Sequence, residues 1–180
     1  MNMSIKHILL AEDDPHDAKL TLAALEEYNL ANKVFAVRDG EAALDYLYCR
    51  EKFEGREGGN PVAILLDLKM PKVDGLEVLK SIKAEPTLRT IPVVMLTSSR
   101  EIPDLEECYK HGVNSYVVKP VDFGEFAKAV KHLGAYWALL NEPPTSPGMD
   151  EPSMTTMKSI PPAKEAVKNK APALSPVLER

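Results

Sequence analysis

Short apolar runs alternate with helix-type patterns through the first 140 residues of the chain. The runs from Ala63 and from Val93 are almost continuously apolar, as in strands that are covered on both faces. Alternating strands and helices pair in parallel through right-handed crossovers. The pattern therefore predicts an α/β fold, a doubly wound five-stranded parallel sheet of the (βα)₅ type. The expected strands are Ile5 to Ala11, Lys33 to Val37, Ala63 to Asp67, Val93 to Leu96 and Ser115 to Val118.

Helix-start signals follow three of these strands. Pro15 lies where the first helix should begin, Asp39-Gly40 makes the turn into the second, and Asp122 is placed to cap the fifth. The glycine-containing stretch from Glu51 to Pro61 predicts a long loop before the third strand, which we interpret as a surface connection.

Aromatic and proline residues divide the chain near residue 140. All four Phe, all six Tyr and the single Trp lie before this point, whereas eight of the 15 Pro lie after it. A segment without aromatic residues and with balanced charges cannot bury enough apolar surface to fold alone. We therefore expect one folded domain over residues 1–140 and a Pro-rich, disordered tail over residues 141–180.

The charge balance excludes some classes of partner. A formal net charge of −5 and a pI near 5.5 do not fit a surface built for nucleic acid, which needs clustered Lys and Arg. The first apolar run is too short for a signal peptide, and no run reaches the length of a membrane span. We expect a cytoplasmic protein with no membrane or nucleic-acid partner. Cys49 and Cys108 lack metal-binding spacing and are expected as free thiols.

Four polar motifs each follow a predicted strand. In chain order they are Glu12-Asp13-Asp14, Asp67, Thr97-Ser98-Ser99 and Lys119-Pro120. Ligands of open α/β sheets bind at the carboxyl ends of the strands, where these motifs should meet. Carboxylates beside a lysine suit a divalent cation and a transferable phosphoryl group, and oxygen ligands favour Mg²⁺. One carboxylate alone would be read as a helix cap, but four motifs in this order favour a shared site.

The same motifs suggest a division of roles. Asp67, at the end of the central strand, is the predicted nucleophile, since an Asp carboxylate can attack phosphorus to give an acyl phosphate. The carboxylates that follow the first strand should crowd against Asp67 and need a cation. Lys119 is the predicted counter-charge for the phosphoryl group and Thr97 its hydroxyl donor.

These motifs resemble the receiver domain of two-component response regulators over residues 5 to about 140. By this resemblance Glu12 and Asp13 match the acidic pair, Asp67 the phospho-accepting aspartate and Lys119 the family's lysine. Thr97 matches the switch hydroxyl and Tyr116 the switch aromatic residue.

The resemblance implies further properties. The strand order should be flavodoxin-like, 2-1-3-4-5, and a sensor histidine kinase should supply the phosphoryl group. Mg²⁺ should bind at the acidic pair and Asp67 together with the backbone carbonyl of Lys69, and the Lys119-Pro120 bond should be cis. The protein should be a phospho-accepting signalling protein with at most slow autophosphatase activity, rather than an enzyme.

The chain is also similar to small stand-alone receivers that partner bacterial phytochromes. The likeness lies in Ala11 to Ala18, the long loop after the second helix, Ile91 to Ser99, and Tyr136-Trp137. It implies a bacterial phytochrome as the kinase.

The predicted fifth helix carries a broad apolar face. Phe123, Phe126, Val130, Leu133 and Trp137 form one stripe, which Ala129, Tyr136 and Leu140 widen. The face either packs entirely on the sheet or contributes to a homodimer. The resemblance implies a switch that changes the surface made by the fourth helix, fifth strand and fifth helix, and the likeness to the phytochrome partners implies a homodimer through this surface.

Three alternatives follow from the same residues. A phosphatase of the haloacid dehalogenase type needs a second Asp two positions after the nucleophile, where this chain has Lys69. A phosphorelay intermediate, passing the phosphoryl group to a histidine phosphotransfer domain, fits the sequence equally well. A phosphorylation-independent binding scaffold would be favoured if a site residue were missing, and none is.

Overall fold

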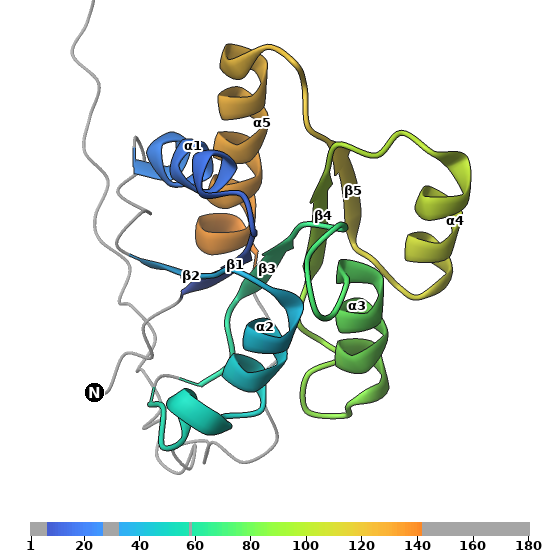
Figure 1. Cartoon of the computed structure of the whole chain (residues 1–180). Helices are drawn as coiled ribbons and strands as arrows, with labels where there is room; N and C mark the ends of the chain where they lie inside the picture. The colour runs from blue at the N-terminus through green and yellow to red at the C-terminus, as the bar shows by residue number, and fades with distance from the viewer. Residues whose placement is uncertain (1–6, 27–32, 58, 142–180) are drawn as a thin grey trace, which may run out of the picture. The chain divides into compact units, whose positions relative to one another are not determined.

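Five parallel strands form one sheet in the computed structural model, which describes residues 7–26, 33–57 and 59–141 (Figure 1). The order β2-β1-β3-β4-β5 confirms the expected flavodoxin-like topology. The strands are β1 (Ile8–Ala11), β2 (Val34–Val37), β3 (Ala63–Leu66), β4 (Val93–Thr97) and β5 (Ser115–Val118). Two of them end differently from expectation, since β3 stops one residue before Asp67 and β4 includes Thr97.

Helices cover both faces of the sheet (Figure 1). They are α1 (Pro15–Glu26), α2 (Gly40–Leu47), α3 (Gly75–Ala84), α4 (Ile102–Lys110) and α5 (Phe123–Ala135), and a π-helical turn, η3 (Tyr136–Leu140), continues α5. α1 packs beside α5 on one face, and α2 packs beside α3 on the other. Among the described residues, no helix combines the length and apolarity that crossing a bilayer requires.

Alternate strand residues fill two hydrophobic cores. In β3, Ile64 and Leu66 face the core under α2, α3 and α4, whereas Leu65 faces the core under α1 and α5. This two-sided burial explains the continuous apolar runs of β3 and β4. Complete burial of one Leu side chain contributes about 2 kcal/mol, so the central strands are firmly held in place.

Aspartates cap four of the helices, α1 among them through Asp14. Asp39, Asp74 and Asp122 accept hydrogen bonds from the backbone N–H three residues later, at 2.7, 2.9 and 2.9 Å. The expected starts of α1 at Pro15 and of α5 after Asp122 are confirmed. Each cap satisfies an amide that the helix itself leaves unpaired.

A segment of the loop after α2 packs against the core. It contains a short 3₁₀ helix, η2 (Glu51–Phe53), whose Phe53 ring packs edge-on against Tyr46 and Phe35. The apolar ring gains by leaving water, so this segment is more than a surface connection. The expected tail lies outside the described residues from residue 142 onward.

Candidate functional site

Carboxylates meet where β1 and β3 end. Because Ala11 pairs with Leu66, the residues that follow these strands, Glu12 and Asp67, emerge side by side. The Asp67 amide donates to the Ala11 carbonyl at 2.9 Å, which fixes the first loop residue after β3. One carboxylate oxygen from each of Glu12, Asp13 and Asp67 lies within 4.8 Å of the others. The structure therefore brings the three predicted acidic residues together.

Two of these carboxylates are buried. Glu12 is 2% exposed and Asp67 is 7% exposed, whereas Asp13 faces solvent. Burial raises the pKa of Glu12 to about 7, although its bond to Lys119 acts in the opposite direction. Burial also raises the pKa of Asp67. Carboxylates that resist ionisation when crowded are stabilised by a cation, so the donor set fits Mg²⁺.

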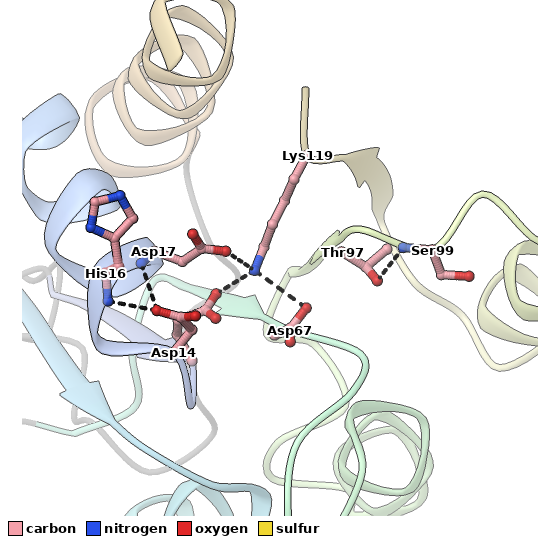
Figure 2. A network of polar contacts seen from close by, with 8 residues as sticks. Asp14, His16, Asp17, Asp67, Thr97, Ser99 and Lys119 are labelled. Atoms are coloured by element: carbon pink, nitrogen blue, oxygen red, sulfur yellow. Dashed lines mark hydrogen bonds and ion pairs between the residues drawn. The ribbon is translucent and has the colours of Figure 1, made fainter. Parts of the chain in front are cut away.

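Lys119 supplies the positive charge of the site. Its Nζ lies 2.8 Å from Glu12 Oε2, 2.9 Å from Asp17 Oδ2 and 3.6 Å from Asp67 Oδ1. Figure 2 shows the side chain reaching from the end of β5 across to Asp67 and Asp17. Although burial alone would lower the pKa of Lys119, its bonds to Glu12 and Asp17 raise it. Lys119 therefore remains charged beside the predicted nucleophile.

Asp17 is the residue that sequence reasoning missed. It lies in the first turn of α1, where an acidic side chain is ordinarily explained by the helix dipole. Asp13 precedes α1, so helical spacing does not relate it to Asp17, and the sequence does not reveal contact with Lys119. The contact depends on how α1 lies over the end of β5.

Thr97 is buried at the end of β4, and its hydroxyl oxygen accepts a hydrogen bond from the Ser99 N–H at 3.0 Å (Figure 2). The hydroxyl proton remains available for a further acceptor. The Tyr116 hydroxyl donates to the Ser99 carbonyl at 3.3 Å. The predicted switch pair, Thr97 and Tyr116, is thus connected through one residue, Ser99.

The loop between β3 and α3 folds tightly back on itself. The Gly75 amide donates to the Leu68 carbonyl at 2.8 Å. A Cβ at Gly75 would lie 2.2 Å from the Asp67 carbonyl oxygen, so the close approach requires glycine. Lys69, the predicted carbonyl ligand, lies in this loop, and its ammonium pairs with Asp104 of α4 at 3.4 Å. The metal-binding role of its carbonyl stays a prediction.

The expected cis Lys119-Pro120 bond is wrong for this structure. The described part of the chain contains no cis peptide bond. The trans form of an X-Pro bond is favoured by about 0.5–1 kcal/mol unless the surrounding fold imposes the other. Here the Lys119 amide still donates to the Thr97 carbonyl at 2.7 Å, and its side chain still reaches the site.

Comparisons with known proteins agree with this geometry. The model of the response regulator receiver domain matches residues 8–131. The probable methanogenesis regulatory protein FilR2 of Methanothrix harundinacea is 43% identical over 137 residues, which make up 76% of this chain and 86% of that protein.

Solved structures show the same likeness. The bacteriophytochrome response regulator AtBRR is 58% identical with a TM-score of 0.62, covering 76% of this chain and 98% of that one. The Mn²⁺-bound form of response regulator Rcp1 is 36% identical with a TM-score of 0.72, covering 78% and 99%. The expected similarity to receivers named for phytochromes is confirmed, and this chain belongs to the response regulator receiver domain family.

Proposed function

We propose that this protein is a response regulator that accepts a phosphoryl group on Asp67. The observation that carries the proposal is the meeting of three carboxylates with Lys119 at the ends of β1, β3 and β5. Asp67 follows β3, the central strand of the sheet, and its Oδ1 lies 3.6 Å from Lys119 Nζ without a hydrogen bond to it, whereas Glu12 is bonded to Lys119 at 2.8 Å. It is therefore the carboxylate placed to react, while Glu12 and Asp13 remain for the cation.

The proposed reaction is transfer from a phosphohistidine of a sensor histidine kinase. An Asp67 oxygen attacks phosphorus, an O–P bond forms, and the P–N bond breaks with its electron pair returning to the histidine. Mg²⁺, held by Glu12, Asp13, Asp67 and the Lys69 carbonyl, would neutralise charge on the phosphoryl oxygens. The Lys119 side chain is 11% exposed, and its ammonium would add a second positive charge in a site partly shielded from water.

A bacterial phytochrome is the proposed kinase. The support is similarity to proteins described as bacteriophytochrome response regulators, one of them 58% identical. We place both proteins in the cytoplasm, with no nucleic-acid or membrane partner. Under this proposal the chain is a signalling protein whose only hydrolytic activity is slow loss of its own phosphoryl group.

The proposed switch runs through Thr97 and Tyr116. The Thr97 hydroxyl proton would turn to a phosphoryl oxygen on Asp67, and the Tyr116 ring would follow it inward. Tyr116 lines a groove of about 430 Å³ with Arg100, Leu105, Val118 and Pro120. Its movement would reshape this groove between α4 and β5, which is a local change with an output at the surface.

A homodimer through the α4-β5-α5 face is the proposed output. Among the described residues of this face, Ile102 and Tyr109 on α4 are exposed, with exposed fractions of 68% and 52%. In contrast, Phe126 and Val130 of the expected stripe pack into the core. The exposed apolar side chains of α4 are therefore the part of this face that suits a partner surface.

The test of the function is intact mass after incubation with acetyl phosphate and Mg²⁺. The wild-type protein should gain one phosphoryl group, and Asp67→Asn or chelation of the metal should prevent the gain. Asp74→Asn is the matched control, because it removes a carboxylate from the same loop while an Asn cap is retained. Labelling of Asp67→Asn equal to wild type would refute the assignment, and no labelling of any form would favour a phosphorylation-independent scaffold.

The proposed homodimer is tested on the same samples by light scattering after size-exclusion chromatography. Phosphorylation should raise the mass of the wild-type particle toward that of a dimer, and Ile102→Lys should prevent this. Glu54→Lys, an exposed change near the opposite edge of the sheet, should not. A phosphorelay intermediate would instead lose its label on addition of a histidine phosphotransfer domain.

A further inference from the structure

Asp17 contacts the site without belonging to the cluster that fits a cation. Its Oδ2 lies 2.9 Å from Lys119 Nζ, and Figure 2 shows it on the α1 side of the lysine, away from Asp67. The three carboxylates whose oxygens gather within 4.8 Å are Glu12, Asp13 and Asp67. Asp17 is therefore a fourth carboxylate, which pairs with Lys119 but lies outside the cluster that fits a cation.

The ammonium group is shared among competing acceptors. A lysine has three N–H donors, and Glu12 and Asp17 each accept one at hydrogen-bond distance. Asp67 Oδ1, at 3.6 Å, is an ion-pair partner rather than a hydrogen-bond acceptor. Lys119 is thus bonded both to a member of the cation-binding cluster, Glu12, and to a residue outside it, Asp17.

The first turn of α1 holds Asp17 in place. Asp14 Oδ1 accepts hydrogen bonds from the amides of His16 at 2.7 Å and Asp17 at 3.3 Å, and α1 starts at Pro15 (Figure 2). These amide bonds lower the pKa of Asp14. Asp14 and Asp17 are therefore two carboxylates of one turn with different partners, since Asp14 bonds backbone amides and Asp17 bonds Lys119.

A cation that binds the cluster would compete with Lys119 for Glu12. Glu12 is 2% exposed and its Oε2 accepts the Lys119 hydrogen bond, so the ammonium and a cation would compete for this oxygen. The lysine side chain is 11% exposed, and a poorly hydrated ammonium without a carboxylate partner is strongly unfavourable. Asp17 offers a partner that does not take part in cation binding.

We propose that Asp17 is a positioning residue that retains Lys119 while Glu12 is released to Mg²⁺. The inference rests on the proposed function, because it assumes that Glu12, Asp13 and Asp67 bind the cation. Replacing Asp17 leaves the ammonium on Glu12 and Asp67, where it competes with the metal for the same oxygens. The consequence is a weaker metal site, although Asp17 never touches the ion.

The test is a calorimetric Mg²⁺ titration of the full chain. Asp17→Asn should weaken binding about tenfold, or about 1.4 kcal/mol, because Asn keeps a hydrogen-bond acceptor but loses the negative charge that makes the bond to the ammonium strong. Asp14→Asn is the matched control, because it removes the same charge from the same turn and leaves the Lys119 bond intact. It should change the affinity by no more than about twofold, as expected for an exposed charge. Equal weakening by the two variants would show a simple charge effect and overturn the proposal.

A double-mutant cycle tests whether Asp17 acts through the lysine. In a Lys119→Met background, Asp17→Asn should weaken Mg²⁺ binding no more than Asp14→Asn does, since there is no ammonium left to hold. The full tenfold loss in that background would overturn the proposal.

A metal-free measurement gives an independent readout. The ¹⁵N resonance of the Lys119 ammonium should shift in Asp17→Asn and stay in place in Asp14→Asn, and an unmoved resonance in Asp17→Asn would count against the bond. The proposed function is checked separately with Asp13→Asn. If the wild-type protein binds no Mg²⁺, or if Asp13→Asn leaves binding unchanged, the assignment of the metal site is wrong, and so is the proposed role of Asp17.

Discussion

Glu12→Gln should stabilise the metal-free protein at neutral and alkaline pH. Glu12 is buried at 2% exposure, and burial raises its pKa from the ordinary 4.5 to about 7 in spite of the bond to Lys119. The folded state therefore binds this proton more tightly than the unfolded state does. The contribution of Glu12 to the unfolding free energy is fully present below about pH 4.5, declines as the pH rises toward 7, and stays low above that. Gln is neutral at every pH and can still accept the Lys119 bond.

The size of the effect follows from the two pKa values. A rise from 4.5 to about 7 corresponds to about 3 kcal/mol of unfolding free energy, because one pKa unit equals about 1.4 kcal/mol. We expect the unfolding free energy of Glu12→Gln to exceed that of the wild-type protein. The difference should grow from near zero at about pH 4.5 to about 3 kcal/mol above about pH 8. Excess Mg²⁺ should reverse the order, since the cation binds and stabilises the ionised Glu12 of the wild type.

The assay is urea unfolding in a chelating buffer, followed by circular dichroism of the helices at several pH values between about 5 and about 8.5. The quantity compared is the difference in unfolding free energy between variant and wild type, because other titrating groups cancel in it. A difference that does not change with pH would refute the argument that Glu12 is held with a raised pKa. A difference that grows with pH but is unaffected by Mg²⁺ would leave the pKa argument intact and contradict the metal site.

Three other substitutions probe the frame around the site. Gly75→Ala should destabilise the fold by about 1–3 kcal/mol and impair phosphorylation of Asp67, because the new Cβ would collide with the Asp67 carbonyl. Gly124→Ala is the control in the same unfolding assay, because its new Cβ would meet only the Asp122 side-chain oxygen, at 3.1 Å. Asp39→Ala should lower the unfolding free energy by about 1 kcal/mol, because it removes the side-chain cap of α2. Although burial raises the pKa of Asp39, the Ala42 amide and Lys72 lower it overall, so this loss should shrink as the pH falls below 3.8. Lys119→Ala should still accept a phosphoryl group by intact mass but show no phosphorylation-dependent change in the Tyr116 NMR signals, and a normal change would contradict its role in the switch.

Local sequence was sufficient to predict the strands and the chemistry at their ends. The near-continuous apolar runs of β3 and β4 indicate strands covered on both faces, and both are buried throughout. Asp67 and the Glu12-Asp13 pair each follow such a run directly, so parallel pairing of the strands was enough to bring them together. Caps such as Asp122 depend on bonds three residues apart and are equally readable from sequence.

Contacts between elements distant in sequence could not be read in this way. The Phe53 ring packs on Phe35 and Tyr46 because the loop folds over the edge of the sheet, although its glycines suggest only a connection. The Tyr116 hydroxyl donates to the Ser99 carbonyl 17 residues away in the chain, and this contact likewise depends on how β5 lies beside β4.

The sequence by itself determined the order of the elements and the residue types at the ends of the strands, because hydrophobic period and helix caps act over a few neighbours. Only the tertiary structure decided which carboxylates share Lys119, since Glu12 and Asp17 lie 107 and 102 residues away from it in the chain. It also decided that Glu12 is buried strongly enough to raise its pKa, whereas its neighbour Asp13 faces solvent. Burial and charge pairing depend on every element packed around a site, and no local pattern records them.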